Sequence, residues 1–158
     1  MPARCEGQPE RPVFARILCG AEFSEPSDYA AGYALSLAQE ANGRLTLLHV
    51  VDWMPDKNLA KFPEFEPAAY REVVIREARR RLEALVPEEA RDWCEPDLWI
   101  SCGKPYREIL RIAAEEGSDL VVLGVHGRGP VDRLLFGSTT QHVVRQALCP
   151  VLTVRART

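Results

Sequence analysis

One segment of the sequence carries the residues best suited to bind a phosphate group. It runs from Gly124 to Gln141, reads GVHGRGPVDRLLFGSTTQ, and lies between an apolar run and a helical pattern. Glycines let the backbone approach an anion closely, and the free N–H groups at a helix N-terminus attract negative charge. Ser138, Thr139 and Arg128 add side-chain donors. These residues indicate a site for a phosphate or a similar anion.

The same segment also fits a purely structural interpretation. Ser138 to Gln141 matches the capping box S-x-x-Q, in which the serine hydroxyl accepts a hydrogen bond from the glutamine N–H and no ligand is needed. The segment is not a Walker A loop, because no lysine follows Gly137. Nor is it the dinucleotide fingerprint, which belongs after the first strand, where residues 20–24 read GAEFS. From the residues alone, anion binding and simple capping both stay open.

The other reactive side chains form no catalytic or metal-binding pattern. His49 and His142 favour structural roles, whereas His126 lies inside the glycine-rich segment, where it could contact a phosphate. The histidines and cysteines lack zinc-ligand spacing, and no Ser–His–acid trio can be placed. The five cysteines form no C-x-x-C pair, which favours reduced thiols in a cytoplasmic protein. We predict neither a metal site nor a catalytic residue.

The composition excludes several classes of protein. The chain has 158 residues, of which 46% are hydrophobic and 27% charged, and its formal net charge is -3. This near-neutral balance argues against a protein whose main task is to bind a nucleic-acid backbone. No apolar run reaches the ~18 residues of a transmembrane helix, and residues 1–12 lack the apolar core of a signal peptide. We therefore expect neither a nucleic-acid nor a membrane partner.

Strands and helices alternate after a flexible N-terminal tail of residues 1–12. Several strands read as continuous apolar runs, which is typical of strands covered on both faces. Ser24 suits the N-cap of the first helix, and Pro87 suits the end of the second. The expected strands cover residues 13–21, 45–51, 98–102, 120–124 and 151–154, and the expected helices cover 24–42, 70–86, 105–117 and 138–148. This order predicts one α/β domain over residues 13–158, with an open parallel sheet between helices.

The connection over residues 52–66 is long for this class of fold and contains Trp53, Phe62 and Phe65. Loops of this length are often lids or binding loops. Two alternatives stay open, namely a lid over the site and a local excursion of the chain.

The glycine-rich segment and several shorter motifs together resemble one known family. The spacing Gly124-x2-Gly127-x9-Gly137-Ser138 matches G-x2-G-x9-G-[ST], the signature of the ATP-binding branch of the universal stress protein family. Other stretches resemble that family's hallmarks in order and spacing: FSE at 23–25, LLHVV at 47–51, GKP at 103–105, SDLVV at 118–122 and CPVLTV at 149–154. The resemblance extends over nearly the whole chain after the tail.

The resemblance implies a Rossmann-like sheet in the order 3-2-1-4-5, a homodimer and a bound adenine nucleotide. The nucleotide would be ATP, with AMP and ADP as alternatives, and Mg²⁺ held mainly by phosphate oxygens and water would fit. By position, Ala21, Val50 and Leu123 would flank the adenine. Glu22 stands where the family usually has an aspartate that contacts the nucleoside, so its carboxylate is displaced by a methylene. Contacts to the phosphates would come from Gly124, His126, Gly127, Arg128, Gly129, Gly137, Ser138 and Thr139.

The last apolar run, Val151 to Val154, is expected at an edge of the sheet. An unpaired apolar edge invites pairing with another strand. Antiparallel pairing with the same strand of a second copy, across a two-fold axis, would satisfy it. We therefore expect the homodimer to form through residues 151–154.

The sequence supports three functions of different classes. The first is a nucleotide-binding regulatory protein of the stress response. The second is a slow ATPase or phosphotransferase, for which the segment offers the charges of Arg128, Asp132 and Arg133. The third is an interaction module without a nucleotide, in which the glycines only form a turn.

The phosphate assignment predicts the effect of Gly127→Val. A valine side chain would block the close approach of the backbone to the anion, so nucleotide binding should be abolished. The dimer should remain, because residues 151–154 are unchanged. Calorimetric titration with ATP and sedimentation measure the two properties, and binding that survives would show that the assignment is wrong.

Overall fold

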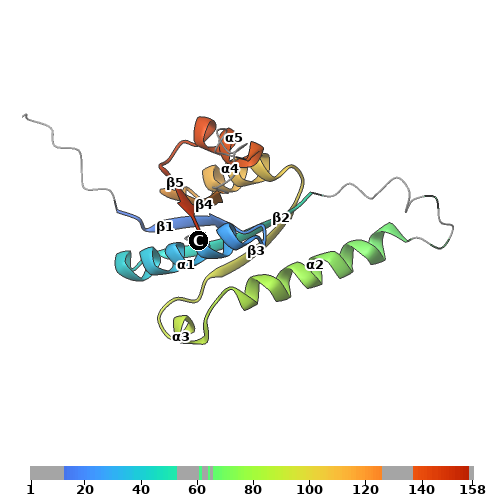
Figure 1. The fold of residues 1–158 in the computed structure, drawn as a ribbon, viewed down its shortest axis with the longest axis horizontal. Coiled ribbons are helices and arrows are strands. Elements are labelled where there is room, and N and C mark those ends of the chain that lie inside the picture. The colour runs from blue at the N-terminus through green and yellow to red at the C-terminus, as the bar shows by residue number, and fades with distance from the viewer. Residues whose placement is uncertain (1–12, 53–60, 62–63, 65, 126–136, 157–158) are drawn as a thin grey trace, which may run out of the picture.

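The computed structural model describes residues 13–52, 61, 64, 66–125 and 137–156, and its centre is a parallel sheet (Figure 1). The strand order is β3-β2-β1-β4-β5, so the predicted Rossmann-like topology is confirmed. The strands are β1 (Arg16–Gly20), β2 (Arg44–Val51), β3 (Asp97–Cys102), β4 (Leu120–Val125) and β5 (Val151–Arg155). The helices are α1 (Glu25–Ala41), α2 (Pro67–Ala84), α3 (Glu88–Arg91), α4 (Pro105–Glu115) and α5 (Ser138–Gln146).

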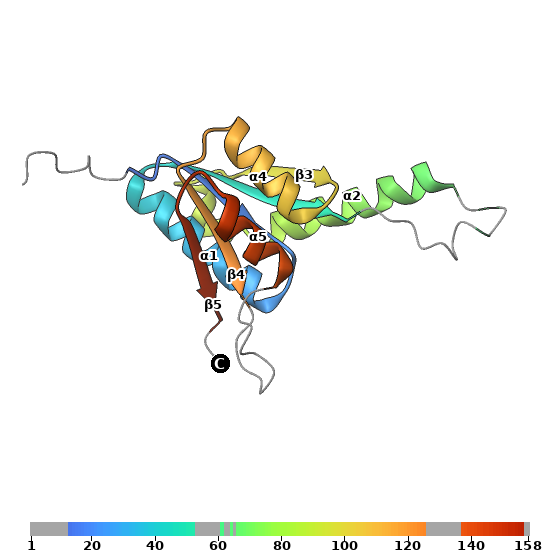
Figure 2. The same ribbon diagram turned by 90° about the horizontal axis from the view of Figure 1, so that it is seen from above.

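Helices cover both faces of the sheet (Figures 1 and 2). On one face, Ile17 of β1 packs in a core with Leu35 of α1 and with α2. On the other face, Leu18 of β1 packs with Ile112 of α4 and Val143 of α5. Successive side chains of a strand point to opposite faces. Because helices cover both faces of the sheet, successive residues of a strand are both apolar, and this explains the continuous apolar runs in the sequence.

β1 is shorter than the predicted run of residues 13–21. Val13 is 66% exposed. The N–H groups of Ala15 and Arg16 donate to the Asp119 carboxylate, at 2.9 and 3.0 Å, instead of to a neighbouring strand. The apolar run predicted the buried centre of the strand, whereas a side chain distant in the sequence determines where the strand begins.

The N-terminus of α5 differs from the predicted capping box. Gly137 is the N-cap residue, Ser138 lies in the first turn, and no side chain in the described part of the chain caps the helix. The Gln141 N–H donates to the Gly137 carbonyl at 3.0 Å, so Ser138 does not fill the role the motif requires. The structure therefore does not support the capping-box alternative that the sequence left open. The helix ends at Gln146 because Ala147 is extended, with ψ of 141°.

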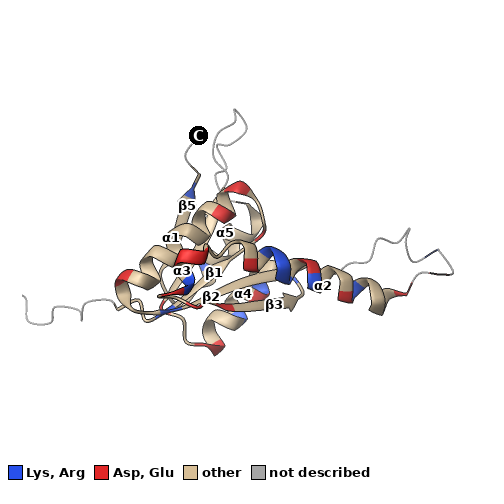
Figure 3. Cartoon of the chain, turned by 90° about the horizontal axis from the view of Figure 1, so that it is seen from below, with Lys and Arg blue, Asp and Glu red and all other residues tan. Residues whose placement is uncertain are grey.

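α2 projects beyond the sheet (Figures 1 and 2). It begins at Pro67, before the predicted start at residue 70, since proline suits the first turn of a helix. Only Ala78 and Leu82 are buried, and residues of both charges alternate along the helix (Figure 3). The four-residue α3 that follows is too short to show a helical period in the sequence. No helix in the described part of the chain is both long and apolar enough to span a membrane.

β4 ends against the first turn of α1, and this contact requires a glycine at position 124. A Cβ atom on Gly124 would lie 2.4 Å from the carbonyl carbon and oxygen of Pro26. These are backbone atoms, so they could move away only if α1 moved. Gly32, within α1, is the opposite case, because none of the described residues outside its own helix comes within 4 Å of the position that its Cβ would take.

The two glycines predict opposite effects of the same substitution. We expect Gly124→Ala to destabilise the fold by about 1–3 kcal/mol, because the new methyl group overlaps fixed backbone. Gly32→Ala should stabilise it by up to about 1 kcal/mol, because alanine favours a helix interior. Urea unfolding followed by circular dichroism measures both free energies. Equal stability of Gly124→Ala and the wild type would contradict the packing argument.

Candidate functional site

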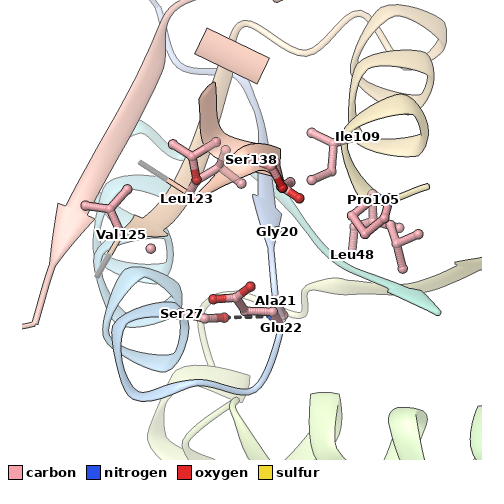
Figure 4. Close-up of a pocket in the computed structure, with 15 residues that line it drawn as sticks. Gly20, Ala21, Glu22, Ser27, Leu48, Pro105, Ile109, Leu123, Val125 and Ser138 are labelled. Atoms are coloured by element: carbon pink, nitrogen blue, oxygen red, sulfur yellow. Dashed lines mark hydrogen bonds between the residues drawn. The ribbon is translucent and has the colours of Figure 1, made fainter. Parts of the chain in front are cut away.

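A cavity of about 330 Å³ lies at the carboxyl ends of β1, β2 and β4. Ligands of open α/β sheets bind at this edge, where the strand order reverses, and in this sheet the reversal lies beside β1. Figure 4 shows Pro105 and Ile109 of α4 on one side of the cavity and Leu123 and Val125 of β4 on the other. The volume is in the range of sites for small molecules.

Every predicted site residue that the structure describes lines this cavity. These residues are Ala21, Glu22, Val50, Leu123, Gly124, Gly137, Ser138 and Thr139. The remaining predicted residues lie in 126–136, outside the described residues: His126, Gly127, Arg128 and Gly129. Most of the predicted lid, residues 52–66, lies outside them as well.

One part of the cavity is apolar. Ala21 and Leu123, at the ends of β1 and β4, are each 4% exposed. Val50 of β2 is half-buried beside them. Pro105 and Ile109 of α4 complete the apolar wall on the opposite side. These surfaces suit an uncharged group such as an aromatic ring.

The other part of the cavity is the N-terminus of α5. The N–H groups of Ser138, Thr139 and Thr140 occupy its first turn, where no carbonyl of the helix can accept from them. Since no side chain among the described residues caps α5, these donors and the positive end of the helix dipole can bind an anion. α4 also begins at the cavity, with Pro105 in its first turn and no side-chain cap.

Glu22 is held in place by two serines, Ser24 at the N-cap of α1 and Ser27 in its first turn. The Ser24 hydroxyl donates to Glu22 Oε1 at 2.8 Å, and the Glu22 N–H donates to Ser27 Oγ at 2.9 Å. Ser24 also caps α1, as predicted, by accepting from the Ser27 N–H at 3.4 Å. Glu22 and Ser27 lie across the cavity from Ser138 (Figure 4). The carboxylate and the N-terminus of α5 are therefore at separate ends.

The two described histidines have structural partners, in agreement with the sequence. His49 Nδ1 lies 2.7 Å from the carbonyl oxygen of Ala21. Burial lowers the pKa of His49, so its ring is neutral at pH 7. His142 Nδ1 lies 2.6 Å from the carbonyl oxygen of Ser138, and its ring stacks on Tyr106 at 4.3 Å between centroids. His142 thus holds the first turn of α5 against α4.

Sequence reasoning missed several residues that line the cavity. They are Gly20, Ser27, Leu48, Pro105, Ile109, Val125 and Thr140. Ile109 is a buried residue of α4, and only the packing of that helix places it opposite the strand ends. Ser27 did carry a signal, because it falls on the apolar face of α1 with Ala30 and Ala34. A hydroxyl on such a face is buried and needs a partner.

The described residues contain no cluster that could bind a metal ion. No group of three or more His, Cys, Asp or Glu side chains among them could hold a metal ion. The described cysteines are unpaired. Burial raises the pKa of Cys19 to about 12, so its thiol stays protonated and unreactive at neutral pH. The arrangement is suited to binding a ligand.

The sequence and fold are similar to those of known proteins. A model of the universal stress protein family matches residues 14–155. A universal stress protein of Thermus aquaticus is 36% identical over 147 residues, which cover 90% of this chain and 100% of that protein. The solved structure of MJ0577, a universal stress protein of Methanocaldococcus jannaschii, has a TM-score of 0.74 at 27% identity and covers 92% of this chain and 99% of its own.

Two more distant solved structures share the fold. One is a universal stress protein in complex with cAMP, with a TM-score of 0.61 at 21% identity, covering 92% of this chain and 99% of its own. The other is a family member from Arabidopsis thaliana with AMP bound, with a TM-score of 0.57 at 19% identity, covering 91% and 93%. The family match spans all five strands and the described cavity residues. This chain belongs to the universal stress protein family.

Proposed function

We propose that this protein binds an adenine nucleotide in the cavity and acts, as a homodimer, as a regulatory protein of the stress response. The observation that carries the proposal is that one cavity joins apolar walls to the uncapped N-terminus of α5. A nucleotide has the same two parts, a flat base and an anionic phosphate chain. ATP is the proposed ligand, with AMP and ADP as alternatives.

The adenine and ribose are assigned to the part of the cavity formed by the strand ends. Ala21, Val50 and Leu123 offer apolar surface to the base. The Glu22 carboxylate can accept hydrogen bonds from ribose hydroxyls. Its orientation by Ser24 limits where those hydroxyls lie.

The phosphates are assigned to the N-terminus of α5. The N–H groups of Ser138 and Thr139 and their hydroxyls are donors there, next to Gly137. The sequence motif adds further proposed contacts from residues outside the described part: His126, Gly127, Arg128 and Gly129. Mg²⁺ would be held by phosphate oxygens and water, because the described residues offer no acidic cluster for it.

Structures with the same fold support the class of ligand. Those solved with cAMP and with AMP both carry an adenine nucleotide. Their identity to this chain is low, so this support is an analogy of fold. The assignment to this chain rests on its own cavity.

The homodimer is assigned to β5, which is an edge of the sheet. The Val121 N–H donates to the Pro150 carbonyl at 3.0 Å, so the backbone groups of Pro150 face β4. Because these groups alternate in direction along a strand, those of Val151 and Thr153 face away from β4. They are donors and acceptors that a second copy of β5 could pair.

A regulatory role fits the described residues better than an enzymatic one. Phosphoryl transfer needs a group that orients the attacking nucleophile and charges that stabilise the transition state. The described cavity residues include one carboxylate, Glu22, and it lies across the cavity from the proposed phosphate site (Figure 4). We propose a cytoplasmic location, on the basis of the cysteine pattern in the sequence.

Replacing Ser138 by glutamate tests the phosphate assignment. Ser138 is exposed in the first turn of α5, where a carboxylate interacts favourably with the helix dipole and should not destabilise the fold. The new charge would repel a phosphate at the same N–H groups, so we expect ATP affinity to fall about 100-fold. Isothermal titration calorimetry with ATP measures this change.

Two controls make the result specific. Ser138→Gln has the same length without the charge, so it should lose much less ATP affinity than Ser138→Glu. Adenosine should bind Ser138→Glu as it binds wild type. Acid release followed by mass spectrometry identifies the nucleotide that co-purifies with the wild-type chain. A wild-type chain that neither retains nor binds an adenine nucleotide would refute the proposed function, and turnover of Mg-ATP would favour the slow ATPase.

Thr153→Pro tests the proposed dimer. The proline ring removes an N–H that faces the open edge of β5, and edge strands tolerate this change. We expect sedimentation to show a dimer for wild type and a monomer for Thr153→Pro, with unchanged circular dichroism. Thr153→Val keeps the N–H and should remain dimeric. A wild-type chain that sediments as a monomer at micromolar concentration would contradict the proposal.

A further inference from the structure

The segment that joins β1 to α1 lines the cavity but has an irregular backbone. It contributes Ala21 and Glu22 to the lining. The next residue, Phe23, has φ of 62°, in the left-handed region that bulky residues rarely adopt. Such a conformation persists only where the surrounding structure imposes it. The contacts made by Phe23 therefore help to determine the shape of the cavity.

Two side chains from other elements hold this segment. His49 of β2 donates from Nδ1 to the Ala21 carbonyl at 2.7 Å, and its ring lies 4.4 Å from the ring of Phe23 between centroids. Arg81 of α2 places its guanidinium carbon 4.2 Å from the centroid of the Phe23 ring, a cation–π contact. Arg81 Nη2 also donates to the Phe23 carbonyl at 3.4 Å. Phe23 is thus held both from the sheet and from α2.

We propose that Arg81 and His49 are positioning residues of the nucleotide site. By holding Phe23, they fix Ala21 and Glu22 against the nucleoside part of the ligand. The inference rests on the proposed function and extends it, since it makes α2 a determinant of nucleotide affinity. No residue of α2 is among the described residues that line the cavity, so Arg81 acts through the β1–α1 segment.

Arg81→Gln in the full chain tests the proposal with two ligands, ATP and adenosine. The segment faces the nucleoside, so both affinities should fall by the same factor, about tenfold for the loss of the cation–π contact and a hydrogen bond. This distinguishes Arg81 from Ser138, where only ATP is affected. Arg81→Lys should restore most of the affinity, because an ammonium group can also lie over the ring.

A neighbouring arginine of α2 provides the matched control. Arg80 pairs with Glu77 at 2.6 Å, and the contacts described for it do not involve the β1–α1 segment. Arg80→Gln should therefore bind both ligands as wild type does. Thermal unfolding gives the melting temperature of each variant, so that the titrations can be made well below it.

Phe23→Gly tests whether Phe23 carries the effect. Glycine accepts a φ of 62° without strain but offers no ring to Arg81. If Arg81 acts through the Phe23 ring, Arg81→Gln should lower adenosine affinity by clearly less than tenfold in the Phe23→Gly background, because only the hydrogen bond to the carbonyl of residue 23 remains there.

Three results would overturn the inference while leaving the proposed function intact. They are wild-type affinity for adenosine in Arg81→Gln, an equal loss in Arg80→Gln, and a full tenfold loss from Arg81→Gln in the Phe23→Gly background. A wild-type chain that binds neither ATP nor adenosine would overturn the proposed function itself, and the inference with it.

Discussion

Both faces of the central strands β1 and β4 are buried, and this constraint places the candidate site. The neighbours Val121 and Val122 of β4 are both 0% exposed, although they point to opposite faces. Each strand is parallel to the next, so the chain must return across a face of the sheet, and helices make that crossing. α1, α4 and α5 therefore all begin at the carboxyl edge of the sheet (Figure 1). Covering the sheet on both sides thus brings several helix N-termini to one edge.

Glycine occupies the positions of the sequence motif for different physical reasons. At Gly124 a side chain would overlap the backbone of Pro26, so glycine is needed there for packing even without a ligand. At Gly137 no atom of the described residues lies within 4 Å of the position of a Cβ, and φ is an ordinary -55°. Packing against the described residues therefore does not explain the glycine at 137, which presents no side chain in front of α5. Within one sequence motif, the glycine at 124 meets a packing requirement, whereas the glycine at 137 permits close approach to the N-terminus of α5.

The sequence predicted the elements well and their ends less well. Apolar runs identify the strands because burial on both faces leaves few polar positions within them. The start of β1 could not be read from the run, because it depends on the Asp119 carboxylate, more than a hundred residues away. The S-x-x-Q pattern at Ser138 is compatible with two starts of α5 that differ by one residue, and local chemistry does not choose between them. Apart from these places and the start of α2, predicted ends agree to within two residues.

The candidate site could likewise be predicted only in part, because some of its residues come together only through packing between distant elements. Residues at or near the carboxyl ends of the strands, such as Ala21 and Leu123, could be grouped from the fold class and the family resemblance. The wall formed by Pro105 and Ile109 required the position of α4, which no local pattern provides. The contacts of Phe23 with His49 and Arg81 join β2, α2 and the β1–α1 segment, so they arise only in the folded chain.

The charges in the cavity would also determine how a nucleotide is oriented. The chain carries a formal net charge of -3, so a general attraction for anions cannot select the phosphate end. Selection would come from the separation of the Glu22 carboxylate and the N-terminus of α5 at Ser138 (Figure 4). With the phosphates at α5, the negative charge meets backbone donors and the ribose hydroxyls face the carboxylate. In the reverse orientation the phosphates would lie beside Glu22, where like charges repel. In the proposed complex, Glu22 would therefore contribute to specificity by excluding the wrong orientation, and a protein of slightly negative charge could still bind an anionic ligand in one orientation.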